Sequence, residues 1–554
     1  MERIKRHDKL LLAILGGAIA ALATPPTNIY PALFIGLAML AMALDDAPSA
    51  WRALGRGVVW ATVASIVGMR FVPGVVERFT PLGFAAGVVA LVLLSAAQSL
   101  LWGIGAAVTN LLQRRARVPL EVAFAAGTMV TVSLPSVFAW TPAGIVCPWT
   151  SLVQLADVIG ERGVSVLFAV ACALLARAAK NATSAELRRS CFRQAIVAPA
   201  GAALGLLAGL ALYGTWRMHA LSDDSASART MRVALINQAV GPNDRWDPKN
   251  FAGILQNLQK LTNDAEAQGV DLTVWPEAAY PYVLDYGTST NPRGPRSVLG
   301  KTLHGPILFG LITVEQPKRT EDGRLERNSR NSATLIVPDG TLQPTYDKLE
   351  LLWFGETIPL GSYLPWLRRI FQKSGGLVPG TEARALVLTH EGEPVRFGVL
   401  NCYEDTLTNV GRRIAREAQP NLLVNVTNDA WFLGSAEPEL HARLARMRAI
   451  EHRLHLVRSV NLGVMSWVDD RGVEVLRDES AKASTMIATP KLRPSSLTLY
   501  GRWGDWPITG LLGIAVLGFA WRERRRGGAA PSAGNSISEK NEADASDETR
   551  VGSS

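Results

Sequence analysis

The chain has 554 residues and a formal net charge of +9 at pH 7, with 48% hydrophobic and 19% charged residues. This composition is too apolar for an ordinary soluble protein and too charged for membrane spans alone, so we expect a membrane part and a soluble part. The basic residues flank apolar runs and form no stripe interleaved with aromatic residues, which argues against nucleic acid as a partner.

Apolar runs dominate the first part of the chain and return once near its end. Each is close to the length that crosses a hydrocarbon layer of about 30 Å as a helix. The first run also has the basic flank and small residues of a cleaved signal peptide, but further runs follow it. We therefore expect a multi-span α-helical membrane bundle of about eight helices, with a seven-helix region over 1–217 and a closing span over 505–523. The runs lie near residues 9–25, 29–45, 57–75, 81–111, 119–140, 164–179, 195–215 and 506–522.

The basic residues that flank these runs are distributed unevenly. If the N-terminus is cytoplasmic and the runs alternate in direction, most flanking arginines and lysines lie on the cytoplasmic side. The short outer loops then hold only Arg70, Arg78 and Arg162. Because positive residues stay on the cytoplasmic side, this pattern predicts that the long segment before the last run is exported to the outer face.

Residues 230–497 have the pattern of a soluble α/β domain. Short β-rich runs cover 232–236, 271–275, 334–337, 395–400 and 422–426, and helical patterns cover 249–268 and 437–455. Strands that alternate with helices over such a length are typical of an α/β domain. The last segment, 524–554, contains little that could be buried, so we expect a disordered cytoplasmic tail.

The sequence lacks the motifs of several common classes of enzyme and binding site. The segment 299–302 resembles the end of a phosphate-binding loop, but Gly294 lies one residue too far upstream. Neither a GxSxG nucleophile elbow nor an HExxH zinc helix is present. The four cysteines have no CxxC pair and no Cys/His ligand spacing, so we expect no metal, no cofactor and no disulfide framework.

Three residues each follow a predicted strand, where α/β domains place reactive groups: Glu277, Lys348 and Cys402. Each alone is more commonly a loop carboxylate, a solvated charge or a small core residue. Together they can form a catalytic group in which Cys402 is the nucleophile and Glu277 is the base that removes its thiol proton. Lys348 and the backbone N–H of Tyr403 suit the negative charge that grows on an attacked carbonyl oxygen. A papain-like alternative uses His441 as the base for Cys402.

Five motifs together resemble the nitrilase superfamily and, within it, the apolipoprotein N-acyltransferases. The resemblance covers nearly the whole chain, and the membrane spans distinguish it from ordinary soluble nitrilases and amidases. The sequence differs from the usual family pattern at Glu350, Trp353, Thr357 and Asn401. The motifs are WPE at 275–277, YDK at 346–348, WFGETIPL at 353–360, CYED at 402–405 and TNDAWF at 427–432.

The resemblance implies a four-layer αββα sandwich and a Glu277, Lys348, Cys402 triad acting as base, oxyanion-stabilising cation and nucleophile. Glu356 and Glu404 resemble family carboxylates that support Lys348 and the acceptor. It further implies that the substrate-binding residues are Trp246, on a mobile arm near the lipid entrance, together with Asn428 and Trp431.

The activity implied by the resemblance is a two-step acyl transfer in a bacterial cytoplasmic (inner) membrane, with the catalytic domain on the periplasmic face. Cys402 takes an acyl chain from a phospholipid, expected to be phosphatidylethanolamine. The N-terminal amine of the S-diacylglyceryl-cysteine of an apolipoprotein then receives it. We expect a monomer. The alternatives are a membrane amidase or acyltransferase with another amine acceptor, and a catalytically silent membrane scaffold.

Overall fold

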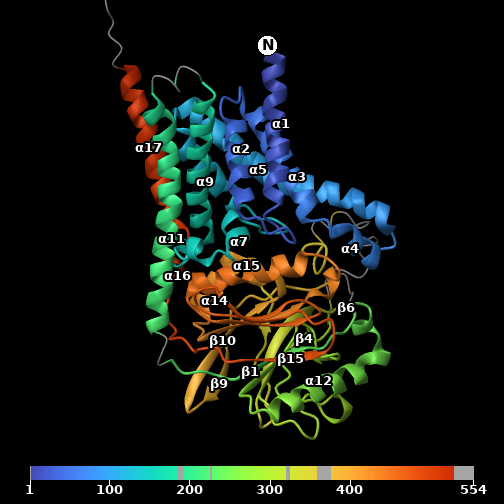
Figure 1. Ribbon diagram of the computed structural model, residues 1–554. Helices are drawn as coiled ribbons and strands as arrows, with labels where there is room; N and C mark the ends of the chain where they lie inside the picture. Colours follow the sequence, from blue (N-terminus) through green and yellow to red (C-terminus); the bar gives the residue numbers. More distant parts are fainter. Residues whose placement is uncertain are drawn as a thin grey trace, which may run out of the picture.

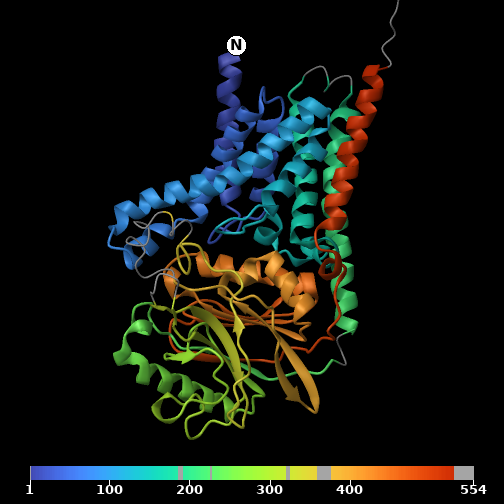
Figure 2. The same cartoon turned by 180° about the vertical axis from the view of Figure 1, so that it is seen from behind.

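The computed structural model describes residues 2–184, 187, 191–224, 228–319, 325–358, 363 and 376–528. A helical bundle lies over a domain of two β-sheets, and α15 (Glu437–His452) lies between them (Figure 1). The view from behind shows the same order, with α11 extending along one side from the bundle to the level of the sheets (Figure 2). The tail expected over 524–554 lies outside the described residues from 529 onward.

The bundle combines helices from the first part of the chain with two that follow the sheets. Leucines exposed by 60% or more lie on α5, α11 and α17, as expected for surfaces in contact with lipid. The helices are α1 (Glu2–Ala21), α2 (Pro31–Leu44), α3 (Ala50–Gly68), α4 (Val72–Phe79), α5 (Gly83–Ala116), α6 (Leu120–Ser133), α7 (Pro142–Val146), α8 (Thr150–Val153), α9 (Ala156–Ala182), η1 (Arg193–Val197), α11 (Ala198–Asp224), α16 (Leu499–Trp503) and α17 (Trp506–Gly528).

The expected count of about eight spans is not confirmed. Among the described residues, three helices are long and apolar enough to cross a membrane: Gly83–Ala116, Ala156–Ala182 and Arg193–Leu221. The helices α3 and α4 add a fourth if they form one span bent by 61°. The helices α2 and α6 have only 14 residues each, about 21 Å of helix, which is shorter than a hydrocarbon layer of about 30 Å.

Glycines allow close helix packing inside the bundle. A Cβ atom on Gly105 of α5 would lie 2.4 Å from the carbonyl oxygen of Gly127 on α6, and one on Gly127 would lie 2.3 Å from that of Gly105. Any side chain at either position would therefore push the two backbones apart. Such small-residue contacts are a common way for apolar helices to associate in lipid, where hydrophobic burial gives little advantage.

The domain below the bundle contains two mixed sheets. The first has the strand order β15-β1-β2-β4-β7-β8, with β3 paired to β4, and the second has the order β14-β13-β12-β11-β10-β9. The bounds are β1 (Val233–Asn237), β2 (Leu272–Trp275), β3 (Val283–Asp285), β4 (Ile307–Val314), β7 (Ser329–Ile336), β8 (Tyr346–Asp347), β9 (Leu386–His390), β10 (Glu393–Asn401), β11 (Leu422–Asn428), β12 (Leu456–Asn461), β13 (Met465–Val468), β14 (Glu474–Asp478) and β15 (Ser484–Ala488), with a separate hairpin of β5 (Lys318–Arg319) and β6 (Leu325–Glu326).

Helices cover the outer face of each sheet, so the domain has four layers. Apolar residues of α12 (Phe251–Glu266) pack with Trp275 and Phe309 of the first sheet. On the other side, α14 (Thr408–Glu417) and α15 contribute to a core shared by both sheets. The strands expected near 232–236, 271–275, 334–337, 395–400 and 422–426 are present, and so are the two helices, which confirms the α/β prediction.

Buried polar contacts connect α15 to the bundle. Arg448 forms an ion pair with Glu161 of α9, and its Nε lies 3.2 Å from Oε2 of Glu451. Just after α15, the Nε of Arg453 donates to Oδ2 of Asp157 at 2.9 Å. Because breaking a buried ion pair leaves an uncompensated charge, these contacts hold the sheets at a fixed position relative to the bundle.

Candidate active site

Three strand ends bring Glu277, Lys348 and Cys402 together. Glu277 lies two residues after β2, Lys348 directly follows β8, and Cys402 directly follows β10. The Nζ of Lys348 lies 3.3 Å from Oε1 of Glu277. All three side chains are buried, with residue exposures of 7%, 2% and 9% in that order. The structure therefore places an acid, a cation and a thiol in one water-poor site.

A second carboxylate and an amide complete the surroundings of Lys348. The Nζ of Lys348 lies 2.8 Å from Oε2 of Glu356. The Nδ2 of Asn331, on β7, donates to Oε1 of Glu277 and to Oε1 of Glu356, both at 2.7 Å. Asn331 thus bridges two carboxylates that would otherwise repel each other. No sequence pattern indicates this role, because Asn331 is one polar residue among several in a strand.

Cys402 occupies a strained turn between β10 and the short helix η5 (Cys402–Thr406). Its φ of 56° lies in the left-handed region, which is costly for a residue other than glycine. Glu404 holds this turn, because its Oε2 accepts from the backbone N–H of Asn401 at 2.8 Å and from the Tyr346 hydroxyl at 2.7 Å. Its Oε1 accepts from the backbone N–H of Leu349 at 2.7 Å. Glu404 therefore connects the cysteine turn to the residue after Lys348.

The electrostatics of the site favour a neutral thiol next to a carboxyl group with a raised pKa. Burial raises the pKa of Glu277, although the nearby Lys348 ammonium opposes the rise. Burial also raises the pKa of the Cys402 thiol well above its usual value, and the charge of Glu277 adds to it. Burial alone would favour a neutral Lys348, but Glu356 and Glu277 outweigh it and raise the pKa of the ammonium. The thiol thus keeps its proton at rest, and Glu277 is positioned to accept it.

Tyr403 connects the nucleophile to the lysine. Its ring centre lies 5.4 Å from the Nζ of Lys348, within cation–π range. Its hydroxyl donates to the carbonyl oxygen of Leu351 at 3.1 Å. Its backbone N–H lies in the first turn of η5, where amide groups have no partner inside the helix. This N–H is available to an oxyanion formed at Cys402.

Cys402 lines a small cavity between the sheets and the bundle. One wall is the bundle segment 137–140, which follows α6, and the opposite wall comes from the catalytic domain. Most lining side chains are apolar, whereas Thr406, Glu437 and His441 are polar. The nucleophile therefore faces the membrane part of the chain.

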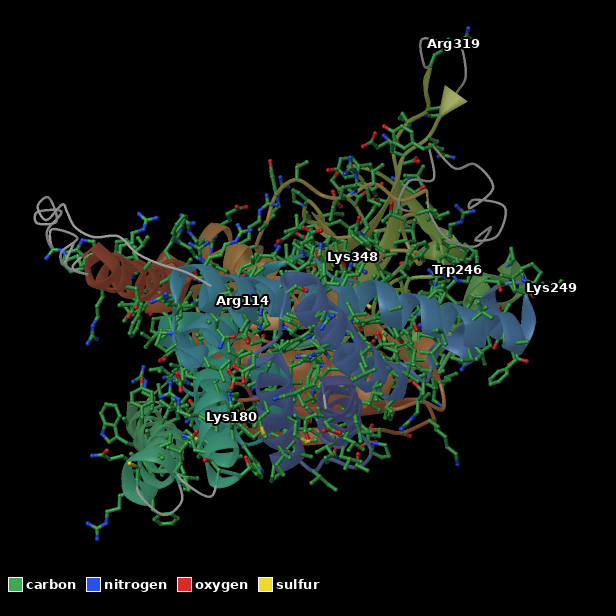
Figure 3. The ribbon with its side chains drawn as sticks, turned by 90° about the horizontal axis from the view of Figure 1, so that it is seen from above. Arg114, Lys180, Trp246, Lys249, Arg319 and Lys348 are labelled. Atoms are coloured by element: carbon green, nitrogen blue, oxygen red, sulfur yellow. The ribbon has the colours of Figure 1, made fainter. Side chains whose placement is uncertain are left out.

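The three residues expected to bind substrate, Trp246, Asn428 and Trp431, are not among the lining residues of this cavity. Trp431 packs against Phe79 of α4, with ring centres 4.2 Å apart. The Oδ1 of Asn428 accepts from Nδ2 of Asn461 at 2.9 Å, which holds the end of β11. Trp246 is 52% exposed beneath the guanidinium of Arg245. Viewed from above, Lys348 lies near the middle of the molecule and Trp246 nearer the edge marked by Lys249 (Figure 3).

His441 is held between two carboxylates. Its Nε2 lies 2.9 Å from Oδ1 of Asp405 and its Nδ1 lies 3.1 Å from Oδ1 of Asp429. Burial favours a neutral ring, but Asp405 and Asp429 raise the pKa of His441 to about 10. Both nitrogens therefore carry protons, so His441 has no free nitrogen that could accept the proton of Cys402. The geometry does not support the papain-like alternative for Cys402.

Comparison with known proteins shows which families the two parts of the chain match. The Carbon-nitrogen hydrolase family matches residues 232–495, and the Apolipoprotein N-acyltransferase N-terminal domain matches residues 16–174. Three proteins named apolipoprotein N-acyltransferase are similar over almost their full length. The one from Bradyrhizobium diazoefficiens is 29% identical over 92% of this chain and 94% of its own. The one from Azotobacter vinelandii is 29% identical over 94% and 96%. The one from Geobacter metallireducens is 30% identical over 94% of this chain and 96% of its own, so the chain belongs to the apolipoprotein N-acyltransferase family.

Proposed function

We propose that this membrane enzyme transfers an acyl chain from a phospholipid to the N-terminal amine of a diacylated apolipoprotein, through a thioester on Cys402. One observation carries the proposal: the buried thiol lines an apolar cavity whose opposite wall is bundle segment 137–140. A hydrolase for small soluble amides has no need of a nucleophile that faces membrane helices. A lipid-anchored substrate, in contrast, reaches such a cavity sideways from the bilayer. We propose phosphatidylethanolamine as the donor.

The first step forms the thioester. Glu277 accepts the proton of Cys402 while the sulfur attacks the ester carbonyl of the phospholipid. Lys348 and the N–H of Tyr403 stabilise the resulting oxyanion, because both are fixed and shielded from water. The carbon–oxygen bond then breaks, and Glu277 returns the proton to the departing lysophospholipid.

The second step transfers the chain. The neutral α-amine of the apolipoprotein attacks the thioester, and Glu277 accepts a proton from the attacking nitrogen. The carbon–sulfur bond breaks, the new amide leaves, and Cys402 regains its proton. Glu356 and Asn331 hold Lys348 and Glu277 in the geometry that both steps need. The apolar walls around Cys402 limit the access of water, which protects the thioester from hydrolysis.

Transfer from a labelled phospholipid tests this function. Purified enzyme should move the labelled acyl chain to a diacylated lipopeptide with a free N-terminus, and should not move it to the same lipopeptide after N-acetylation. The acetylated peptide is the matched control, because only its nucleophile is removed. Release of the label as free fatty acid at the same rate with either peptide would identify a lipase or amidase instead.

We further propose that the catalytic domain, residues 230–497, lies on the periplasmic face of the cytoplasmic membrane. The bundle supports this orientation, because Arg78 donates to the carbonyl oxygens of Trp431 and Leu433 in the catalytic domain. At the other end of the bundle, Lys180 pairs with Asp45 and Asp46. The two sets of contacts lie at opposite ends of the bundle, which is consistent with the outer and inner faces that the distribution of basic residues predicts.

We also propose that the membrane part covers residues 1–217 and 505–523 and crosses the bilayer about eight times. The short helices support this count, since α2 packs between α1 and α9, and α6 packs between α5 and α9. We propose that one chain acts as a monomer, because Glu277, Lys348, Cys402 and the cavity walls all come from it.

Reporter fusions test the orientation. A reporter that is active only in the periplasm should be active when fused near Ser225, and inactive when fused after Arg526. A fluorescent protein that folds only in the cytoplasm should give the opposite result at the same two positions, which controls for expression. The reverse pattern in both reporters would place the catalytic domain in the cytoplasm and contradict the proposal.

A further inference from the structure

The first residue of α15, Glu437, carries a buried carboxyl group. Glu437 is 9% exposed, and its buried Oε2 has no hydrogen-bond partner among the described residues. Burying a carboxylate without a partner is costly, so such a group in a folded protein requires an explanation. Burial raises the pKa of Glu437 to about 8. The side chain contributes to the wall of the cavity that Cys402 also lines, which points to a ligand.

The charges around Glu437 do not balance. The groups that face it are His441 from the same helix, Asp429 from η6 (Asp429–Phe432), Asp405 from η5 and Arg458 from β12. His441 is hydrogen-bonded to Asp405 and Asp429, and Arg458 is paired with Asp405. Both cations are thus engaged by the two aspartates, and three carboxylates face only two cations. Within the described part of the chain, Oδ2 of Asp429 also has no hydrogen-bond partner. When Glu437 is ionised, the cluster therefore has one negative charge more than it compensates, and a cation bound beside it would favour this ionised form.

A primary ammonium group suits this position better than a metal ion. Ligand atoms of Asp429, Glu437 and His441 lie within 4.8 Å of one another, near enough to surround a cation. A metal, however, requires an unprotonated histidine nitrogen, and both nitrogens of His441 face carboxylate oxygens at hydrogen-bonding distance. An ammonium needs no such nitrogen, because it donates three hydrogen bonds to oxygen acceptors.

The remaining cavity wall indicates what carries the ammonium. Apolar side chains of the bundle segment 137–140 and of Leu352, Phe432 and Leu444 surround the polar end. Such a lining fits an amphiphile with a hydrocarbon part and one cationic end. Phosphatidylethanolamine has this chemistry in its headgroup, and a diacylated lipopeptide has it at its N-terminus.

We propose that Glu437, together with Oδ2 of Asp429, binds the primary ammonium group of a lipid-anchored substrate beside Cys402. This inference rests on the proposed function, since that function brings such substrates to the cavity. Glu437 thus selects substrates by charge, whereas Glu277 and Lys348 carry out the chemistry. A carboxylate at the end of an apolar pocket disfavours neutral and anionic competitors, because they would leave it unpaired.

Glu437→Gln tests the proposal in each half-reaction. The first measures acylation of Cys402 by phosphatidylethanolamine and by phosphatidylglycerol with the same acyl chains. The second measures discharge of the acyl-enzyme by the lipopeptide. We expect KM for the ammonium-bearing substrate to rise about tenfold or more, the scale of one charge-assisted hydrogen bond, while kcat changes little.

The two half-reactions identify the source of the ammonium. If the headgroup binds, KM rises for phosphatidylethanolamine and not for phosphatidylglycerol. If the peptide N-terminus binds, donor KM values are unchanged and that of the lipopeptide rises. Unchanged KM values in both half-reactions would overturn the proposal. So would wild-type activity that EDTA removes and Zn²⁺ restores, because the cluster would then be a metal site.

Glu439→Gln is the matched control, with the same change on the same helix. Glu439 pairs with Arg443 and Arg477 and is not among the residues that line the cavity, so neither KM should respond. Glu437→Gln should also unfold at or above the wild-type temperature, since its Oε2 has no hydrogen bond to lose. Binding of phosphatidylethanolamine, phosphatidylglycerol and lipopeptide to Cys402→Ala, with and without Glu437→Gln, gives the same comparison without turnover. A failure of the transferase function is therefore distinguishable from a failure of the ammonium site.

Discussion

Purified enzyme given phospholipid and no lipopeptide should accumulate one fatty acyl group on Cys402. The expectation follows from the geometry, because the thiol shares a buried site with a base and an oxyanion-stabilising cation while the apolar cavity limits access of water. Mass spectrometry of the peptide that contains Cys402 should show the added acyl mass. Neutral hydroxylamine should remove it, as expected for a thioester.

Substitutions at Cys402 make this expectation specific. Cys402→Ala should abolish both the adduct and the transfer, and it should leave folding almost intact, because alanine keeps the Cβ atom in the left-handed turn. Cys402→Ser should transfer poorly, since a hydroxyl is far harder to deprotonate than a thiol. Adding a diacylated lipopeptide should discharge the wild-type adduct. Transfer that continues in Cys402→Ala would show that the amine attacks the phospholipid ester directly.

Lys348→Met should reduce turnover by about 100-fold or more, the usual scale for losing a main oxyanion stabiliser. Lys348 is also the cation between two buried carboxylates, at 2.8 Å from Glu356 and 3.3 Å from Glu277. Its removal leaves both without a counter-charge, which costs about 3–5 kcal/mol for a broken buried pair. The variant should therefore unfold at lower temperature as well as react slowly, and thermal unfolding beside single-turnover rates measures both effects.

A double variant separates stability from catalysis. Glu356→Gln removes one of the two uncompensated charges, so Lys348→Met with Glu356→Gln should recover much of the lost stability. It should not recover activity, because the oxyanion still lacks its cation. If the double variant regained wild-type rates, Lys348 would be a structural residue and not part of the chemistry.

The sequence was most informative where reactive residues follow predicted strands. Glu277, Lys348 and Cys402 each follow a run of strand-forming residues, and the structure brings them together in one buried site. Asn331 could not be found in this way, because its contact with two carboxylates depends on the pairing of β7 with β4 and β8. Glu437 was also hidden, since an acidic residue in the first turn of a helix is common and usually stabilises the helix dipole.

The membrane part shows the limit of hydropathy. The apolar runs predicted which segments are suited to the membrane, but they contain no signal for the 61° bend between α3 and α4. They also merged short helices with the loops beside them: the run at 119–140 contains a helix of only 14 residues. The segment 137–140 at the end of this run forms a wall of the cavity that contains Cys402.

The pairing of β1 with β15 has a consequence for biosynthesis. These strands are the first and last of the catalytic domain, and Val233 lies opposite Ala488. During translation, one edge of β1 therefore stays open until nearly all of the domain has been made, and an open edge invites pairing with other chains. The next helices along the chain are α16 and α17. Closure of the sheet and synthesis of α17 thus follow each other within a few tens of residues. A nascent chain that stalls before β15 therefore exposes an unpaired edge to the chaperones of its compartment.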